Sequence, residues 1–89
     1  MTTIGIVTEY STGIAPTAGP RAIITGSDGA LWFTAYQGAK IGRITTAGKI
    51  SNYSGLAANS GPFDITTGPN GRLWFTEISA NQVGRILVP

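Results

Sequence analysis

Few side chains in this sequence are suited to catalysis. The 89 residues include six Lys and Arg, four Asp and Glu, and neither His nor Cys. Histidine is the usual general base near neutral pH, and thiolate metal sites and disulfides need cysteine. The groups that remain bind ions through carboxylates or guanidinium groups. We take as candidate ligand-binding residues four that fall near predicted loop ends: Arg21, Phe63, Asp64 and Glu77.

These candidates have a functional and a simpler interpretation. Asp64 and Glu77 together suit a cation and Arg21 suits an anion. A solvated loop end with weak ion pairs explains the same residues, and this simpler interpretation is favoured. Arg43 and Arg85 recur within a repeat, which favours packing of their aliphatic stems over a functional role.

The glycine-rich turns do not match known binding loops. Asp28 and Asn70 are each followed by Gly, which is typical of hairpin turns, whereas a calcium loop needs several more oxygen ligands at defined spacing. No Lys-Ser/Thr follows the glycines as it does in a phosphate loop, and no Gly-x-Ser-x-Gly nucleophile motif occurs. These patterns do not predict an enzyme.

Charge and hydropathy exclude other classes of partner. The net charge of +2 is small and the basic residues are scattered, so we expect no nucleic-acid surface. No apolar run is long enough to span a membrane. The first seven residues lack the basic start and apolar core of a signal peptide, so we expect a cytoplasmic location if the chain is expressed as given and leave its natural location open.

An internal repeat predicts the elements that must position these residues. Residues 19–44 and 61–86, offset by 42, share 13 identities in 26 positions, including Leu-Trp-Phe-Thr and Gly-Arg-Ile. A second register, offset by 43, places residues 2–5 on 45–48 and Tyr10 on Tyr53. Repeats of this period indicate stacked supersecondary units rather than an irregular domain.

Each period contains four strand-like runs. In the first complete copy, strand A covers about residues 22–26, B 30–36, C 40–45 and D 48–54. A unit of about 42 residues with four antiparallel strands is typical of a β-propeller blade. We therefore predict an all-β fold with two four-stranded antiparallel blades per chain.

Apolar residues on both faces of strand B indicate that both faces are covered. Leu31 and Phe33 point to one face, and Trp32 and Thr34 point to the other. Blades that stack face to face bury both sides of each sheet. We predict that core packing and assembly depend on Ile6, Tyr10, Trp32, Phe33, Trp74, Phe75, Val83 and Ile86.

The order of the strands predicts assembly. Residues 1–89 form one two-blade unit, with a D strand at 4–10, a blade at 19–54 and strands A, B and C at 61–87. Unpaired strand edges and uncovered faces favour association, so we expect each D strand to complete a blade of an identical copy. The contact is head-to-tail and stays finite only if the ring closes. A homotrimer with six blades is favoured, and a homotetramer with eight is next.

The repeat resembles that of the virginiamycin B lyase (streptogramin lyase) family, over nearly the whole chain. The resemblance rests on the run Gly-Pro-x-x-Ile, the Leu-Trp-Phe-Thr motif and the Gly-Arg-Ile motif. It implies a propeller fold. It also implies an enzyme of seven blades that opens streptogramin B antibiotics by magnesium-dependent elimination, with catalytic histidines and metal-associated glutamates at one end of the channel.

The family's site is only partly present. Some of the family's histidines follow Gly-Pro, and this chain has Arg21 and Phe63 at those positions. Glu77, in the second repeat, matches a glutamate of the family's repeat, but the equivalent position in the first repeat is Ala35. In a propeller the D–A and B–C loops lie at one end, so we expect Arg21, Phe63, Asp64 and Glu77 to lie close together. We expect self-assembly without catalysis or cofactor. The alternatives are small-ligand or ion binding at the channel mouth, and residual streptogramin B lyase activity with magnesium.

Overall fold

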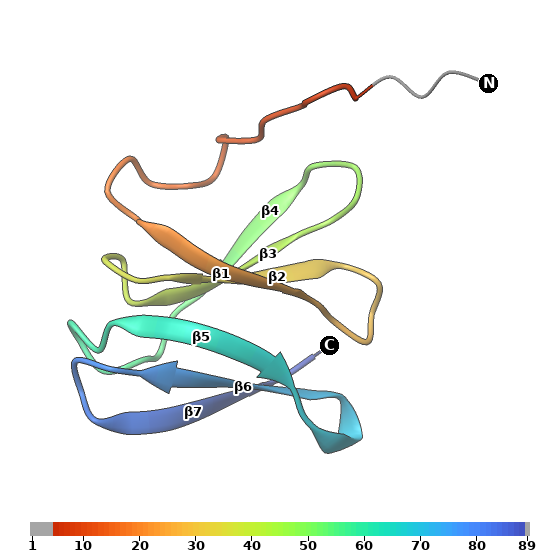
Figure 1. The fold of residues 1–89 in the computed structure, drawn as a ribbon. Helices are drawn as coiled ribbons and strands as arrows, with labels where there is room; N and C mark the ends of the chain where they lie inside the picture. The colour runs from red at the N-terminus through yellow and green to blue at the C-terminus, as the bar shows by residue number, and fades with distance from the viewer. Residues whose placement is uncertain (1–4, 89) are drawn as a thin grey trace.

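Seven β-strands form two antiparallel sheets in the computed structural model, which describes residues 5–88 (Figure 1). The first sheet has four strands in sequence order: β1 (Pro20–Thr25), β2 (Leu31–Ala35), β3 (Lys40–Ile44) and β4 (Ile50–Tyr53). The second has three: β5 (Pro62–Thr67), β6 (Arg72–Glu77) and β7 (Gln82–Leu87), with a single 3₁₀ turn, Pro69–Gly71, between β5 and β6. The all-β prediction is confirmed. The strands of the first sheet differ from their predicted bounds by two residues at most.

Both sheets have the same register. Ile23 lies opposite Phe33 in the first sheet, as Ile65 lies opposite Phe75 in the second. Each sheet has an irregularity at the start of its first strand, between Pro20 and Ile23 and between Pro62 and Ile65. The sequence repeat is therefore also a structural repeat.

Two glycines explain part of the repeated motif Gly-Arg-Ile. Gly42 lies opposite Phe33, and Gly84 lies opposite Phe75. Each phenylalanine ring lies over its glycine so closely that a Cβ atom there would overlap the ring. A larger residue at either position would displace the ring, which is why glycine occurs at an interior strand position where it is otherwise unfavourable.

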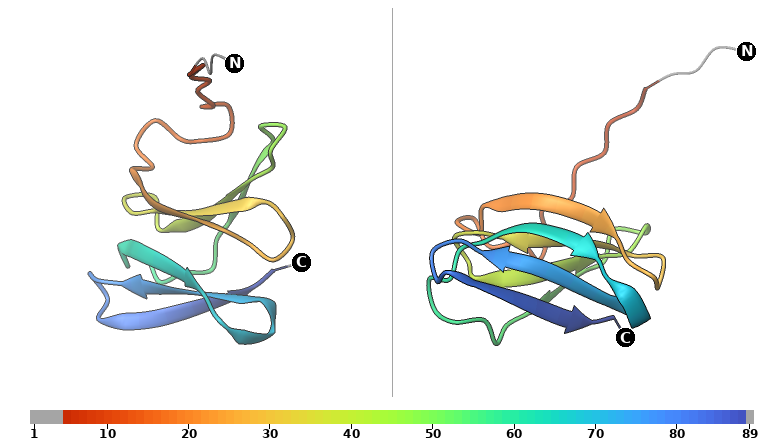
Figure 2. Two further views of the ribbon diagram at one scale, coloured as in Figure 1. Left: turned by 45° about the vertical axis from the view of Figure 1, so that its right-hand side comes forward. Right: turned by 60° about the horizontal axis from the view of Figure 1, so that its bottom comes forward.

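The core lies between the two stacked sheets (Figure 2). The Trp32 side of the first sheet packs against the Leu73 and Phe75 side of the second, and the cluster of buried apolar residues consists of Trp32, Ile41, Ile65, Leu73 and Phe75. The first strands of the two sheets, β1 and β5, lie beside each other. Burial between repeats rather than within one repeat is typical of stacked blades.

A buried threonine connects the sheets by hydrogen bonds. The Oγ1 atom of Thr34 accepts the backbone N–H of Ala22 at 3.1 Å and donates to the carbonyl oxygen of Phe63, in the other sheet, at 3.0 Å. Thr34 is fully buried. A buried hydroxyl with both hydrogen bonds satisfied holds the two sheets in a defined relative position.

The segment before β1 is not paired in a sheet. Residues 5–9 of the predicted strand 4–10 run away from both sheets (Figure 1), whereas the Tyr10 ring lies against Gly48 in the β3–β4 turn, and Ile4 lies outside the described residues. The side chains of Ile6 and Val7 are 82% and 84% exposed. At the other end of the chain, β7 has β6 as its one neighbour among the described strands. No helix in residues 5–88 is long and apolar enough to cross a membrane.

Candidate functional site

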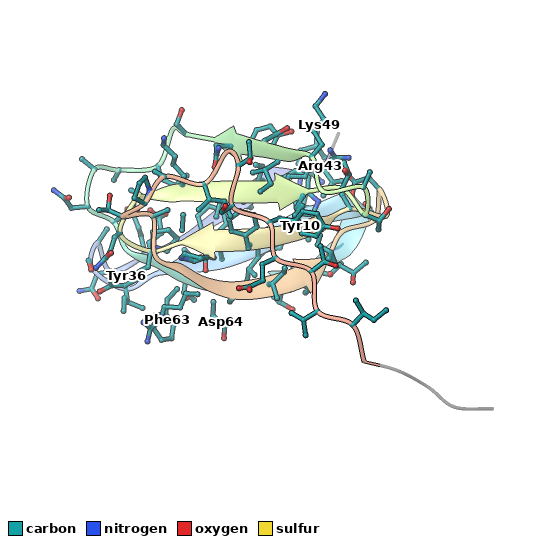
Figure 3. All side chains as sticks on the ribbon, turned by 90° about the horizontal axis from the view of Figure 1, so that it is seen from above. Tyr10, Tyr36, Arg43, Lys49, Phe63 and Asp64 are labelled. Carbon is teal, nitrogen blue, oxygen red and sulfur yellow. The ribbon has the colours of Figure 1, made fainter. Side chains whose placement is uncertain are left out.

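An aromatic–guanidinium cluster lies where β1 and β5 begin. The guanidinium carbon of Arg21 is 4.3 Å from the ring centroid of Phe63 and 5.5 Å from that of Tyr36. The two rings meet edge to face at 6.3 Å. Tyr36 follows β2 directly, so the cluster joins a β2–β3 loop of one sheet to the first strand of the other. In Figure 3, Tyr36 and Phe63 lie on one side of the molecule, away from Arg43 and Tyr10.

Two of the four predicted ligand-binding residues come together here. Arg21 and Phe63 are in contact, and Tyr36 is the member of the cluster that sequence reasoning missed. Its signal was weak because the repeat places Ile78 at the matching position, so the aromatic ring is not part of the repeated pattern.

Asp64 and Glu77 lie on opposite faces of the second sheet. Asp64 is exposed beside Thr76, whose Oγ1 accepts the Asp64 N–H at 3.2 Å, and its own carboxylate accepts the Ile65 N–H. Glu77 is 5% exposed, lies on the side that faces the first sheet, and its Oε2 atom has no hydrogen-bond partner within residues 5–88. Thr76, the neighbour of Asp64, and Glu77 are consecutive residues of β6, so their side chains point to opposite faces of the sheet. Glu77 therefore does not join Asp64 in one site.

A second polar cluster holds the first β1–β2 turn. The Nε atom of Arg43 donates to the Oδ2 atom of Asp28 at 2.8 Å, and the Trp32 indole N–H donates to its Oδ1 atom at 3.2 Å. Burial acts to raise the pKa of the Asp28 carboxyl. The hydrogen bonds from Arg43, Trp32 and the Ala30 backbone outweigh it, so this pKa lies below its usual value. Arg43, predicted to pack by its stem, also forms an ion pair.

The matching turn of the second sheet has no carboxylate. Asn70 stands where the first sheet has Asp28, and Arg85 keeps only the stacked position, 5.6 Å from the Trp74 ring centroid. The comparable distance from Arg43 to the Trp32 ring is 5.8 Å. The contact of arginine with tryptophan therefore occurs in both sheets, and among residues 5–88 the ion pair with a carboxylate occurs only in the first.

Each of the two sheets has a hollow on its outward face. We call the outward side of the first sheet the Phe33 face; the hollow on it, of about 290 Å³, is lined by Tyr10, Ile14, Pro20, Arg21, Ala22, Ile23, Phe33 and Ile44. We call the outward side of the second sheet the Trp74 face; its hollow, of about 270 Å³, is lined by residues that include Thr66, Trp74, Thr76 and Val83. Apolar faces of this kind mark interaction surfaces.

The two faces match the two sides of the buried interface inside the chain. The Trp74 face carries the residues equivalent to Trp32, Thr34 and Ile41, and the Phe33 face carries those equivalent to Leu73 and Phe75. Ile41 is fully buried, whereas its counterpart Val83 is 64% exposed. Ile65 is 7% exposed, whereas its counterpart Ile23 is 62% exposed. Each outward face is thus one half of an interface that the chain already forms once.

A model of the virginiamycin B lyase family matches residues 1–89. This chain belongs to the virginiamycin B lyase family. The prediction of that family from the Leu-Trp-Phe-Thr and Gly-Arg-Ile motifs is confirmed. No curated protein matched the chain.

Solved lyases of this family contain the same two sheets. The selenomethionine-substituted virginiamycin B lyase from Staphylococcus aureus is 44% identical over 94% of this chain and 28% of the lyase chain, with a TM-score of 0.87. A catalytically inactive variant of the S. aureus enzyme with quinupristin is 47% identical over 81% of this chain and 25% of its own, with a TM-score of 0.77. A streptogramin B lyase structure is 54% identical over 81% of this chain and 25% of its own, with a TM-score of 0.75. The chain therefore spans about a quarter of the length of these solved relatives.

The described residues do not form the magnesium site that the virginiamycin B lyase family implies. Within residues 5–88 no group of three His, Cys, Asp or Glu side chains comes together. The buried, unpartnered Oε2 atom of Glu77 is a suitable oxygen ligand, but Asp64 lies on the other face of the sheet. Magnesium prefers near-octahedral oxygen coordination, usually with more than one carboxylate or phosphate oxygen.

Proposed function

We propose that this chain is a self-assembling unit of a β-propeller. Identical copies stack the Trp74 face of one on the Phe33 face of the next, and the N-terminal segment of each copy completes the three-stranded sheet of its neighbour. The observation that carries this proposal is the match between the two outward faces and the two halves of the buried interface within the chain. Such a contact is head-to-tail, and we propose that the rotation between copies closes it into a ring.

Thr76 supports the contact between the Trp74 face of one copy and the Phe33 face of the next. Its Oγ1 atom accepts the Asp64 N–H, as Thr34 accepts the Ala22 N–H, but no described residue accepts its proton. Thr34 donates to the Phe63 carbonyl oxygen. By the repeat, the proton of Thr76 is directed to the Arg21 carbonyl oxygen of the next copy.

The N-terminal segment supports strand exchange with a defined register. In the first sheet, β3 and β4 place Ile41 opposite Tyr53 and Arg43 opposite Ser51. The offset of 43 gives Tyr10 and Thr8 as the counterparts of Tyr53 and Ser51. The exchanged strand therefore pairs Tyr10 with Val83 and Thr8 with Arg85 of the neighbour, which satisfies the open edge of β7.

Stacking of aromatic rings adds to this joint. Tyr53 stacks on Trp32 with centroids 5.3 Å apart and an angle of 24° between the rings. Tyr10 is 47% exposed and Trp74 is half-buried in the single chain. In the assembly Tyr10 stacks on the Trp74 ring of the neighbour, a contact worth about 0.5–1.5 kcal/mol beyond the area that it buries.

The assembly that we favour is a trimer with six blades, followed by a tetramer with eight. Fewer copies lose less translational and rotational entropy on association. No catalysis is proposed for this unit, because the sequence has no histidine to serve as a general base near neutral pH. Linearised product from a streptogramin B antibiotic in the presence of magnesium would contradict this part of the proposal.

Engineered cysteines test the exchanged strand directly, because the sequence has no native cysteine. Thr8→Cys combined with Arg85→Cys should form disulfides between copies under mild oxidation. Residues directly opposite each other lie within the Cα separation that a disulfide accepts. The control combines Thr8→Cys with Val83→Cys, which lies two residues away on β7 and beyond that separation. Equal cross-linking of both pairs, or disulfides only within single chains, would contradict the proposed register.

Anion binding at the Arg21 cluster is a second candidate function. The guanidinium of Arg21 is held on the Phe63 ring and has no ion pair among the described residues. A ligand that binds only the folded state raises the melting temperature. Phosphate should therefore raise it for the natural chain and not for Arg21→Gln. Equal shifts for both chains would remove the basis of this candidate.

A further inference from the structure

The D strand of the first sheet has a polar contact that the exchanged strand cannot repeat. The amide Nδ2 of Asn52 donates to the Gly13 carbonyl oxygen at 2.8 Å, which attaches β4 to the segment that leads into β1. By the offset of 43, the residue that replaces Asn52 in an exchanged strand is Glu9. An ionised carboxylate accepts hydrogen bonds and donates none.

Gly55 is the counterpart of Gly13 in the second sheet. Both residues have left-handed backbone conformations, with φ of 110° and 97°, and both are followed by an aliphatic residue and Ala. A Cβ atom on Gly13 would lie 3.2 Å from the Cβ atom of Ile50 on β4, whereas one on Gly55 has nothing within 4 Å. The space beside Gly55 is the space that the D strand fills in the first sheet.

The face of the second sheet on which Glu9 would lie already holds a carboxylate, that of Glu77. In the proposed register Glu9 lies opposite Gly84, as Asn52 lies opposite Gly42. The Oε1 atom of Glu77 is 3.1 Å from the position of a Cβ atom on Gly84, and the Oε2 atom of Glu77 is buried with no hydrogen-bond partner in the described part of the chain. The first sheet has Ala35 in place of Glu77, so no carboxylate stands at that position beside Asn52.

We infer that Glu9 limits the strength of strand exchange. Its carboxylate meets the Gly55 carbonyl oxygen and the Glu77 carboxylate of the neighbouring copy, where the first sheet has an amide donor and an alanine. The inference rests on the proposed assembly and names the residue that sets the affinity of the interface between copies. The pairing of the exchanged strand with β7 of the neighbour is therefore weaker than the equivalent pairing of β4 with β3 inside the chain.

Three chains measured in parallel test this inference: the natural chain, Glu9→Asn and Glu9→Ala. Sedimentation in buffer with a chelator, which keeps divalent cations from bridging two carboxylates, gives the concentration at which half of each chain is assembled. Glu9→Asn should lower that concentration by about threefold to tenfold per joint, because the amide donates to Gly55 as Asn52 donates to Gly13. Glu9→Ala makes the same change in charge without a donor and should lie between the other two.

Glu77 supplies a second readout. Glu77→Gln should strengthen assembly of the natural chain and have a smaller effect in the Glu9→Asn background, because the two carboxylates act on each other only when both are present. Unfolding of the dissociated chain should not differ between Glu9→Asn and the natural sequence, since Glu9 is exposed and forms no ion pair with another described residue.

The outcomes separate the inference from the proposed function. If every chain stays monomeric at all concentrations, the proposed assembly is wrong and the inference with it. If the natural chain assembles and neither Glu9→Asn nor Glu9→Ala assembles at a lower concentration than it does, assembly stands and the role of Glu9 is wrong. If both variants assemble at the same lower concentration, the Glu9 carboxylate limits assembly and the hydrogen bond to Gly55 is ruled out as its cause.

Discussion

The two sheets have the same motifs and register, but their side chains have different surroundings. Ile41 in the first sheet is fully buried, and its counterpart Val83 in the second is 64% exposed. The difference is reversed on the other face, where Ile65 is buried and Ile23 is exposed. The burial of these two pairs depends on whether another sheet covers them, whereas Phe33, on the outward face, is 6% exposed, close to the 5% of its counterpart Phe75. In such an architecture the core belongs to the contact between repeats.

The sheets also differ in the number of their strands. The first has four, and the second has three among the described residues. The segment that matches the absent strand, residues 5–10, is present in the chain and unpaired. In the proposed assembly a second copy provides the strand that the second sheet lacks, and the predictions below test each part of this proposal.

Removal of residues 1–10 should have the largest effect. The truncated chain lacks the strand that pairs with β7, so the oligomer should be lost and monomer or aggregate should replace it. Light scattering after size-exclusion chromatography measures this change. A chain with a Gly/Ser segment of equal length in place of residues 1–10 is the control for chain length. An unchanged ring in either variant would show that the segment does not close it.

The tryptophans provide a matched pair. Trp32→Ala should destabilise the single chain by about 3–5 kcal/mol, because Trp32 is fully buried between the sheets. Trp74→Ala should cost the single chain less, because Trp74 is half-buried, and should weaken assembly instead. Urea unfolding of both variants, at a protein concentration low enough to keep the chains dissociated, measures the two losses of stability. Equal losses in the dissociated chains would mean that the Trp74 face is covered within one molecule.

The two threonines give a smaller contrast. Thr34→Val leaves the Ala22 N–H and the Phe63 carbonyl oxygen without their partner inside the interface, at a cost of about 1–3 kcal/mol. Thr76→Val should change the stability of the single chain by about 0.5 kcal/mol or less, since water can bind the exposed Asp64 N–H. Chemical denaturation of both variants checks the difference. A larger loss for Thr76→Val would reverse the assignment of buried and open faces.

The turn clusters give the smallest effect, which depends on pH. The pKa of Asp28 is lowered in the folded chain, so its contribution to stability is present above the unfolded value of about 3.9 and is lost as the pH falls through the folded value. The melting temperature of the natural chain should exceed that of Asp28→Asn at pH 7, and the difference should shrink below about pH 4. Asn70→Asp should introduce a similar pH dependence in the second sheet by giving Arg85 a partner. A constant difference across this range would mean that the ion pair between Asp28 and Arg43 does not contribute to stability.

Much of the fold could be predicted because the repeat restricts it. Two copies of Leu-Trp-Phe-Thr, with apolar residues on both faces, require strands that are covered on both sides. The left-handed turn at Asn70 follows from an Asn-Gly pair. The strand bounds were less certain, since β1 begins at Pro20 and propensity alone gave no reason to start there.

The details of the candidate site could be predicted only in part. The contact of Arg21 with Phe63 follows from their matching positions on adjacent first strands. Tyr36 and the ion pair between Asp28 and Arg43 depend on residues that differ between the two repeats, so the repeat gave no signal for them. The separation of Asp64 from Glu77 depends on which side of β6 faces the first sheet, and that is set by packing between sheets.

The number of copies in solution tests the central claim most directly. Native mass spectrometry of the unmodified chain, over a range of concentrations, counts the copies in each assembly. We predict one closed species of three copies of the 9.2-kDa chain, with four copies as the alternative that keeps the same joint. A stable monomer at all concentrations would contradict the account.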